Sequence, residues 1–189
     1  MKTLENLIKA YVGESQARNR YSFYASKAKK EGFEQISEIF LLTADNEKEH
    51  AETFFDLIQE LKGDSKEIAI EAMAPLVIGK TEVNLAAAIA GEHEECCHLY
   101  PAFAEDAKKE GFEKVAAKFL AISSVEKHHE ERYKAIYDLV KSGKFFKRDE
   151  QIVWVCRKCG YVHIGKQPPK VCPSCGHDTS FYQRLCENY

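Results

Sequence analysis

A seven-residue stretch that occurs twice constrains the fold of this chain more than any other feature. Residues 28–34 and 107–113 both read AKKEGFE, 79 positions apart (from 28 to 107). Further identities recur at a spacing of 78 for Gly13-Glu14 and Gly91-Glu92, and at 79 for Tyr21 and Tyr100, Phe40 and Phe119, Glu47 and Glu126, and His50 and His129. Such a pattern indicates an internal duplication, with one residue gained or lost between the two spacings.

Each copy is predicted to form a hairpin of two helices. Apolar residues recur about every 3.5 positions on both sides of the shared glycine, Gly32 or Gly111, which is typical of the buried stripe of a helix. Glycine ends a helix readily because it has no β-carbon and tolerates the left-handed backbone conformation. The stripe is less regular in the third helix, where we expect it to contain Leu85, Ala88, Glu92, Glu95, Leu99 and Ala102.

The segment between the two hairpins predicts how they are connected. Residues 63–79, GDSKEIAIEAMAPLVIG, are too many for a tight turn. A connection of this length lets the second and third helices run parallel, as in bundles with one long crossover. Pro75 argues against a long helix within the segment, so we expect at most a short helix at 65–73. The predicted fold class is mainly α, a four-helix bundle with one long crossover.

A small module follows the helical part. Beyond residue 150, short runs rich in Val, Tyr, Pro and Gly replace the helical pattern, and five of the seven cysteines lie between 156 and 186. We therefore predict a helical domain over 1–145 and a small β-rich domain over 150–189. The odd number of cysteines argues against a disulfide framework and favours metal or redox chemistry.

Acidic and imidazole side chains stand in the middle of each predicted buried stripe. Glu14 precedes Gly32 by 18 residues, and Glu47 and His50 follow it by 15 and 18. At about 1.5 Å of rise per residue, all three lie roughly 22–27 Å from the turn. The second hairpin repeats this spacing, so seven groups are predicted to meet at one level of the bundle: Glu14, Glu47, His50, Glu92, Glu95, Glu126 and His129.

Five buried carboxylates at one level require compensating positive charge, because burying even one ionised carboxylate is costly. Arg18 and Arg20 are the nearest basic residues in the sequence. Two divalent ions would neutralise four of the five charges. A glutamate from each of two helices with Glu-x-x-His from the other two is the pattern of di-iron or di-manganese carboxylate proteins. One Glu-x-x-His usually lies on a solvated face, but two related by duplication and flanked by Phe, Ile and Leu favour a dinuclear site.

Two Cys-x-x-Cys-Gly hooks predict a second metal site, formed by Cys156, Cys159, Cys172 and Cys175. Four thiolates in this spacing make a tetrahedral site for zinc or a single iron. The glycine after each hook permits the turn that aims backbone N–H groups at sulfur. We expect no ligand role for the remaining cysteines and for the histidines outside the stripes: Cys96, Cys97, Cys186, His93, His98 and His128.

Charge and hydropathy exclude several classes of partner. The formal net charge is −3, so nothing in the overall balance attracts nucleic acid or an anionic membrane. No stretch approaches the 18 or so apolar residues of a membrane span. The first residues interrupt their apolar positions with Glu5, Lys9 and Glu14, which is unlike a signal peptide. We therefore expect a cytoplasmic protein with neither nucleic acid nor membrane as a partner.

Taken together, these motifs resemble the rubrerythrin family over essentially the whole chain. The resemblance is carried by GESQARNRY at 13–21, EKEH at 47–50, GEHEE at 91–95, LYP at 99–101, EKHH at 126–129, and the hooks CRKCGYVH and CPSCGH. It implies a ferritin-like bundle with a non-haem di-iron centre and a rubredoxin-like domain with one iron in a Cys₄ site, for which zinc is a possible substitute. The implied activity is reduction of hydrogen peroxide to water in defence against oxidative stress.

The resemblance also implies partners and residue roles. Electrons would come ultimately from NAD(P)H through a redox protein of the rubredoxin or NAD(P)H-rubredoxin reductase type, and the chain would form a head-to-tail homodimer. Glu47 and Glu126 would bridge the irons, Glu14 would bind one iron, and Glu92 and His129 the other. Glu95 and His50 would exchange as ligands of the first iron when its oxidation state changes. Tyr21 and Tyr100 would hold carboxylates in place.

The duplication singles out Glu95 independently, because its counterpart three residues after Glu14 is Ala17. The site thus has one carboxylate more than the symmetric pattern needs. Two alternatives remain open. One is a ferroxidase or iron-handling protein of the ferritin-like type, and the other is a bundle whose tail is a zinc-ribbon docking module. An electron-delivering Cys₄ site and the extra carboxylate favour peroxide reduction, because iron storage needs no reductant.

Overall fold

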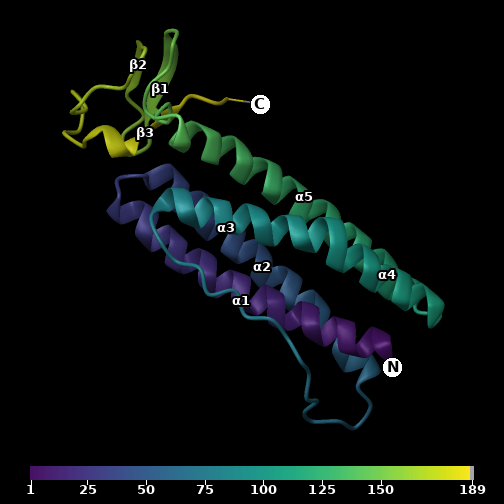
Figure 1. Ribbon diagram of the computed structural model, residues 1–189. Helices are drawn as coiled ribbons and strands as arrows, with labels where there is room; N and C mark the ends of the chain where they lie inside the picture. The colour runs from purple at the N-terminus through teal and green to yellow at the C-terminus, as the bar shows by residue number, and fades with distance from the viewer. Residues whose placement is uncertain (188–189) are drawn as a thin grey trace.

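The computed structural model describes residues 1–187, which form a bundle of long helices with a small sheet at one end (Figure 1). The first hairpin consists of α1 (Lys2–Lys30) and α2 (Glu34–Leu61). The third arm is α3 (Thr81–Glu94), a π-helical turn (Glu95–Leu99) and α4 (Tyr100–Lys109), and α5 (Glu113–Lys141) is the fourth. The predicted fold class, mainly α with a four-helix bundle, is confirmed.

Both predicted helical turns occur at the glycines of the repeated motif. Gly32 and Gly111 have φ angles of 81° and 83°, the left-handed conformation in which a β-carbon would be strained. After each glycine the backbone N–H of the next residue bonds back five positions, from Phe33 to Ala28 at 2.9 Å and from Phe112 to Ala107 at 2.8 Å. This is the hydrogen bonding of a Schellman motif, which satisfies carbonyls that the helix end leaves free.

The glutamate of each repeated motif connects its hairpin to the other one. The carboxylate of Glu110 accepts the backbone N–H groups of Lys2 at 2.9 Å and of Thr3 at 2.8 Å. The carboxylate of Glu31 accepts the backbone N–H of Thr81 at 3.0 Å. Each acid therefore satisfies unpaired donors at the start of a helix in the opposite hairpin, where a negative charge also complements the helix dipole.

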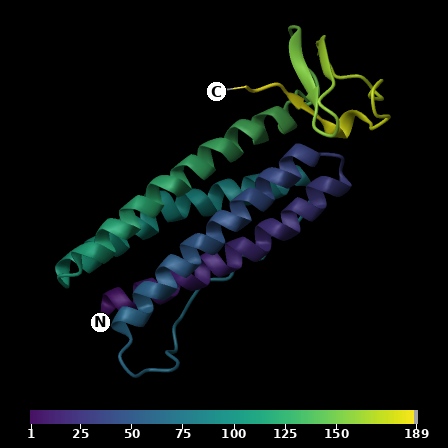
Figure 2. The ribbon, with the colours of Figure 1, turned by 180° about the vertical axis from the view of Figure 1, so that it is seen from behind.

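The crossover between α2 and α3 runs back along α1, so that α2 and α3 point the same way (Figures 1 and 2). Its contacts with α1 include the hydroxyl of Tyr24, which donates to the carbonyl of Val77 at 2.7 Å. The short helix expected at 65–73 does not form, since residues 67–79 adopt no helix or strand. Ile68 and Met73 stay exposed, and so short a helix is not stable without a buried apolar face.

The π-helical turn explains the irregularity of the third arm. A π turn contains one more residue than an α turn, and Glu95–Leu99 lies between the match at spacing 78 and the match at spacing 79. The extra residue rotates every later side chain around the axis. The predicted buried stripe is therefore wrong at Leu99 and Ala102, and the structure buries Tyr100 and Ala104 instead.

The C-terminal module is a three-stranded antiparallel sheet in the order β2-β1-β3. Its strands are β1 (Ile152–Cys156), β2 (Val162–Gly165) and β3 (Tyr182–Arg184), with a short 3₁₀ turn at Thr179–Phe181. The module lies at the end of the bundle where α1 turns into α2 (Figure 2). There Arg157 forms an ion pair with Glu38. Within residues 1–187, no helix has both the length and the apolar character needed to cross a membrane.

Candidate metal centres

The predicted level of charged residues lies between two apolar clusters of the bundle. Phe40 and Tyr133 belong to the cluster on one side, and Phe54 and Phe119 to the cluster on the other. All four side chains are fully buried. The carboxylates and imidazoles between them are therefore shielded from water along the bundle axis, where unpaired charge is most costly.

Six of the seven predicted residues form two adjoining groups. Each group offers four ligand atoms within 4.8 Å of one another, and both groups contain Glu47 and Glu126. Glu14 and His50 complete the first group, whereas Glu92 and His129 complete the second. The helices α1, α2, α3 and α5 all contribute. The structure thus brings together residues that are up to 115 positions apart (from 14 to 129).

Each imidazole points one nitrogen at several carboxylates. His129 Nδ1 lies 2.9 Å from Glu126 Oε2, 3.3 Å from Glu47 Oε1 and 3.5 Å from Glu92 Oε2. His50 Nδ1 lies 2.8 Å from Glu126 Oε1, 3.0 Å from Glu47 Oε2 and 3.8 Å from Glu14 Oε1. In each group one nitrogen and three oxygens thus lie close enough together to bind a single metal ion.

The hydrogen bonding of these groups is incomplete in a way that fits bound cations. Although imidazole nitrogens lie close to several carboxylate oxygens, these contacts lack hydrogen-bond geometry at many buried atoms, namely Glu14 Oε2, Glu47 Oε1, Glu92 Oε2, both carboxylate oxygens of Glu126, and His129 Nδ1. Native proteins rarely leave such atoms unsatisfied, because each costs its full desolvation energy. Two divalent ions would supply the missing partners, so the residues fit a dinuclear metal site.

The pKa values at this level are shifted first by burial and then by neighbouring charges. Burial raises the pKa of Glu92 to about 8, against the opposing effect of His129. Burial, and then repulsion from Glu126, likewise raises the pKa of Glu14 well above its usual value. Burial disfavours protonated imidazole, but neighbouring carboxylates outweigh it and raise the pKa of His129 to about 12 and that of His50 to about 9. Positive charge at this level therefore stabilises the buried carboxylates.

The two predicted tyrosines hold carboxylates across the duplication. Tyr21 of the first hairpin donates its hydroxyl to Glu92 of the second, and Tyr100 of the second donates to Glu14 of the first. Both tyrosines are buried. Hydrogen bonds of this kind fix the orientation of metal-binding carboxylates.

Glu95 stands apart from both groups of four. It belongs to the π-helical turn, and its carboxylate passes close to Gly13. Burial, followed by repulsion from Glu92, raises its pKa well above the usual value, while Arg20 opposes the shift. Of the two arginines that the sequence places nearest this level, Arg20 therefore lies close enough to stabilise the charge of Glu95, whereas Arg18 is exposed. Glu95 and Tyr100 also line a cavity of about 580 Å³ beneath the crossover.

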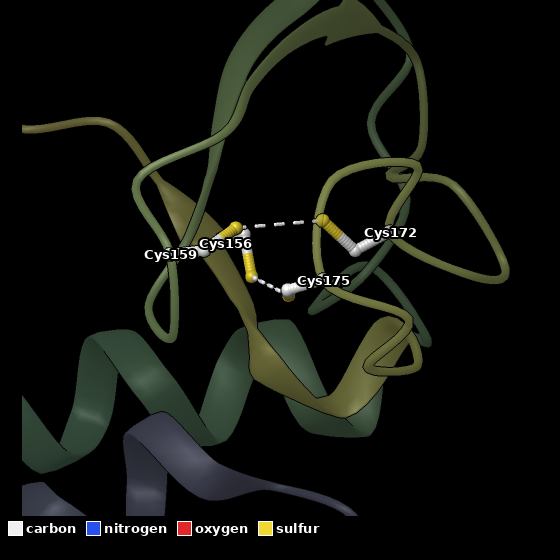
Figure 3. A group of neighbouring side chains, drawn as sticks. All are labelled: Cys156, Cys159, Cys172 and Cys175. Atoms are coloured by element: carbon white, nitrogen blue, oxygen red, sulfur yellow. Dashed lines mark hydrogen bonds between the residues drawn. The ribbon is translucent and has the colours of Figure 1, made fainter.

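The four predicted cysteines converge in the C-terminal module (Figure 3). Cys156 Sγ lies 3.8 Å from Cys175 Sγ, and Cys159 Sγ lies 3.6 Å from Cys172 Sγ. None of them is in a disulfide. Four thiols with sulfurs this close fit tetrahedral binding of one metal ion.

Glycines shape both cysteine hooks, as predicted. Gly160 and Gly176 have φ angles of 79° and 76°, and each donates its N–H to the carbonyl of the first cysteine of its hook, at 2.8 and 2.9 Å. Burial opposes ionisation of Cys172, but the nearby hydroxyl of Tyr182 and the backbone N–H groups of Cys175 and Ser174 lower its pKa to about 6. The hook thus stabilises a thiolate, the form that binds metal.

Sequence reasoning missed Glu130. Its side chain is fully buried on α5 and forms ion pairs with Lys127 at 2.7 Å and with Lys134. His93 Nδ1 lies 2.9 Å from its Oε1. The repeat contained a signal, because the counterpart of Glu130 at a spacing of 79 is Ala51. Because the first copy forms the same hairpin without a charge at this position, the buried Glu130 is not needed for the fold that the two copies share.

Comparison with known proteins agrees with both centres. Residues 5–137 match the sequence model of the rubrerythrin family, and residues 154–183 match that of the rubrerythrin rubredoxin-like domain. A putative rubrerythrin of Methanocaldococcus jannaschii is 52% identical, with 100% of this chain and 95% of the relative covered. Rubrerythrin-1 of Clostridium acetobutylicum is 51% identical, with 100% and 96% covered.

Solved structures agree with the fold. The partially reduced state of nigerythrin is 30% identical with a TM-score of 0.66, and the match covers 97% of this chain and 86% of nigerythrin. Bacterioferritin of Rhodobacter capsulatus is 21% identical with a TM-score of 0.67, over 75% and 86% of the chains, and shows the bundle fold alone. The chain therefore belongs to the rubrerythrin family, with the family's di-iron site in a ferritin-like bundle and a rubredoxin-like Fe(Cys)₄ site in the domain that follows.

Proposed function

We propose that this protein is a peroxidase that reduces hydrogen peroxide to water at the carboxylate and histidine groups of the bundle. The observation that carries the proposal is the presence of two different metal centres in one chain. A site that only oxidised Fe²⁺ for storage would need no partner to return electrons to it. A four-cysteine site, in contrast, is suited to one-electron transfer.

Ligand roles follow from the two groups of four. Glu47 and Glu126 belong to both groups, so they are proposed to bridge the two irons. Glu14 and His50 would then hold the first iron, and Glu92 and His129 the second. When bound, the irons would supply electrons for cleavage of the O–O bond, and the Fe(Cys)₄ site would return electrons to them. The hydroxyls of Tyr21 and Tyr100 hold the carboxylates of Glu92 and Glu14 in orientation.

The residues around the cavity support access of peroxide and protons. Reduction of one H₂O₂ to two H₂O consumes two electrons and two protons. The cavity of about 580 Å³ reaches Glu95 and Tyr100 from the side of the crossover. Glu95 is half-buried there and lies outside the two groups of four, so its carboxylate is free to carry protons toward the site. We assign Glu95, His50, Tyr21 and Tyr100 to the catalytic machinery.

Glu95 and His50 are further proposed to exchange as ligands of the first iron. In the present structure His50 points into the first group and Glu95 does not. Exchange of a neutral imidazole for a carboxylate adds a negative charge, which compensates the higher charge of oxidised iron at a buried site. We expect crystals of the oxidised protein to show Glu95 on this iron and crystals of the reduced protein to show His50. Identical ligands in both would contradict the exchange.

The position of the Cys₄ site bears on the route of electrons. The module contacts α2 at Glu38, nine residues before Glu47, which corresponds to about 14 Å along the helix, and the cysteines lie beyond that contact. A head-to-tail homodimer would place the Cys₄ site of one subunit near the bundle centre of the other. We propose this arrangement, in the cytoplasm, with NAD(P)H-coupled redox proteins as the electron source.

An anaerobic spectroscopic experiment tests the activity. Iron-loaded protein is expected to show the thiolate-to-iron absorption of an oxidised Fe(Cys)₄ site, which disappears on reduction. Stoichiometric hydrogen peroxide is expected to restore that absorption and to be consumed. A protein without this absorption would instead have a zinc-ribbon module. Reoxidation by O₂ with accumulation of ferric iron, but not by peroxide, would favour the ferroxidase.

A further inference from the structure

A fourth group of side chains that could hold a metal ion is formed by α3, the π-helical turn and α5. His93, Cys96, Cys97 and Glu130 each offer one ligand atom, and these atoms lie within 4.8 Å of one another. This outer cluster shares no residue with the two bundle groups or with the four-cysteine group. His93 and Glu130 adjoin the bundle ligands Glu92 and His129 in sequence, but they belong to neither bundle group.

The π-helical turn contains Cys96 and Cys97, and His93 lies just before it in α3. His93 precedes Cys96 and Cys97 by three and four positions, the spacings that share one face of a helix. The turn that begins at Glu95 is wider than an α-helical turn, so successive side chains are rotated by a smaller angle around the helix axis. Cys96 Sγ lies 2.6 Å from Cys97 Sγ and 3.8 Å from Glu130 Oε2. His93 Nδ1 lies 2.9 Å from Glu130 Oε1.

Cys96 and Cys97 are poorly placed to form a disulfide with each other because they are adjacent in the chain. Consecutive α-carbons are about 3.8 Å apart across a trans peptide bond, whereas disulfides usually join α-carbons at least about 4.4 Å apart. Two sulfurs on one tetrahedral zinc ion, at Zn–S distances of about 2.3 Å, lie about 3.8 Å apart. Binding therefore requires the sulfurs to separate from their present 2.6 Å, which a rotation of the exposed Cys97 side chain provides. Two free thiols beside an imidazole and a carboxylate therefore favour coordination over pairing.

The charges around the outer cluster allow a cation despite two nearby lysines. Lys127 and Lys134 pair with Glu130, so the cluster and these two lysines together carry one net positive charge when both thiols are protonated and His93 is neutral. A divalent ion that displaces the two thiol protons leaves that net charge unchanged. Glu130 is fully buried, whereas the His93 side chain is 49% exposed and Cys97 is exposed. The site therefore has a fixed inner ligand and an open path for entry from solvent.

We propose that His93, Cys96, Cys97 and Glu130 form a separate binding site for one divalent transition-metal ion, Zn²⁺ by preference. Two sulfurs, one nitrogen and one oxygen are the donor set of a tetrahedral zinc site. Hard cations such as Mg²⁺ and Ca²⁺ prefer oxygen ligands alone.

Cobalt provides a direct test, because thiolate-bound Co²⁺ is coloured. The full-length protein is first loaded with iron in both established sites, reduced anaerobically and then titrated with Co²⁺. One equivalent is expected to bind with thiolate-to-cobalt absorption while the iron content stays constant. Zn²⁺ is expected to abolish that absorption, because it binds such ligands more tightly than Co²⁺.

Variants separate this site from the other cysteines. Cys97→Ala alters an exposed side chain and is expected to remove the absorption, and Glu130→Gln is expected to weaken Co²⁺ binding at least about tenfold. Cys186→Ala, which removes another exposed thiol, is the matched control and should bind Co²⁺ like the parent protein. No absorption in the parent, its persistence in Cys97→Ala, or release of iron equal to the cobalt bound would each overturn the proposal.

Discussion

Replacement of Cys172 by serine is expected to abolish NAD(P)H-coupled peroxide turnover while two metal ions remain bound in the bundle. Cys172 is 2% exposed and lies in the core of the C-terminal module beside Trp154 and Tyr182. Serine removes one of four sulfurs from the site that is proposed to pass electrons. The bundle ligands lie on other elements and keep their hydrogen bonds.

Three measurements on one preparation check this expectation: metal content, visible absorption and the rate of NAD(P)H oxidation with an added redox partner. The loss in coupled rate should exceed about a hundredfold, whereas chemically reduced protein should still consume one round of peroxide. Cys186→Ser is the control, because Cys186 is exposed and outside the cysteine group. Coupled turnover by Cys172→Ser at the parent rate would show that electrons reach the bundle without the Cys₄ site.

Replacement of Glu92 by glutamine is expected to stabilise the metal-free protein and to prevent it from binding two irons. The pKa of Glu92 is raised to about 8 by burial. A raised carboxyl pKa has no cost below the unfolded value near 4.5 and destabilises the folded state progressively as pH rises toward 8. At pH 7 the cost is on the order of 3 kcal/mol, and glutamine removes it while keeping an oxygen for the Tyr21 hydroxyl.

Urea unfolding of the metal-free protein at pH 5 and pH 8 measures this effect. The parent is expected to lose stability between these values, and the variant to lose less. Added Fe²⁺ should stabilise the parent far more than the variant, because ligand binding to the folded state adds to its stability. Glu94→Gln, at an exposed neighbouring position, should behave like the parent at both pH values. A metal-free Glu92→Gln protein less stable than the parent at pH 8 would contradict this explanation.

The first experiment tests how electrons reach the bundle, and the second tests what its buried carboxylates cost in stability. Five carboxylates at one level make the bundle less stable than a fully apolar core would, and metal ions reverse that penalty. The aromatic clusters on either side of the level, with Phe40 in one and Phe119 in the other, pack the helices together through contacts that do not involve the proposed metal ligands. Such packing would let the bundle keep its fold during the proposed exchange of Glu95 and His50.

The duplication explains why so much of the fold was predictable. Two copies of AKKEGFE mark both hairpin turns, and the helical period on either side gives the buried stripes. Because rise per residue in a helix is constant, counting from Gly32 and Gly111 was enough to place Glu14, Glu47 and Glu126 at one level. The four-cysteine site was equally predictable, because each Cys-x-x-Cys hook is defined by residues close together in the sequence.

The two wrong predictions of secondary structure and burial concern segments whose structure depends on more than the local sequence pattern. The short helix expected at 65–73 fails because no neighbouring element buries its apolar side chains. The stripe of the third arm fails after Glu95 because a π turn rotates the helix there, although the change of spacing from 78 to 79 already recorded the extra residue. Period alone does not say whether an inserted residue widens a turn or lengthens a loop.

The sequence by itself determined the number of helices, the level of the charged residues and the identity of both cysteine hooks, because each depends on spacing along one chain segment. Only the tertiary structure decided which atoms meet. The positions of Tyr21 against Glu92 and of Glu130 against His93 depend on how separate helices are rotated toward one another. That rotation is set by side-chain packing across the whole bundle, which no single segment encodes.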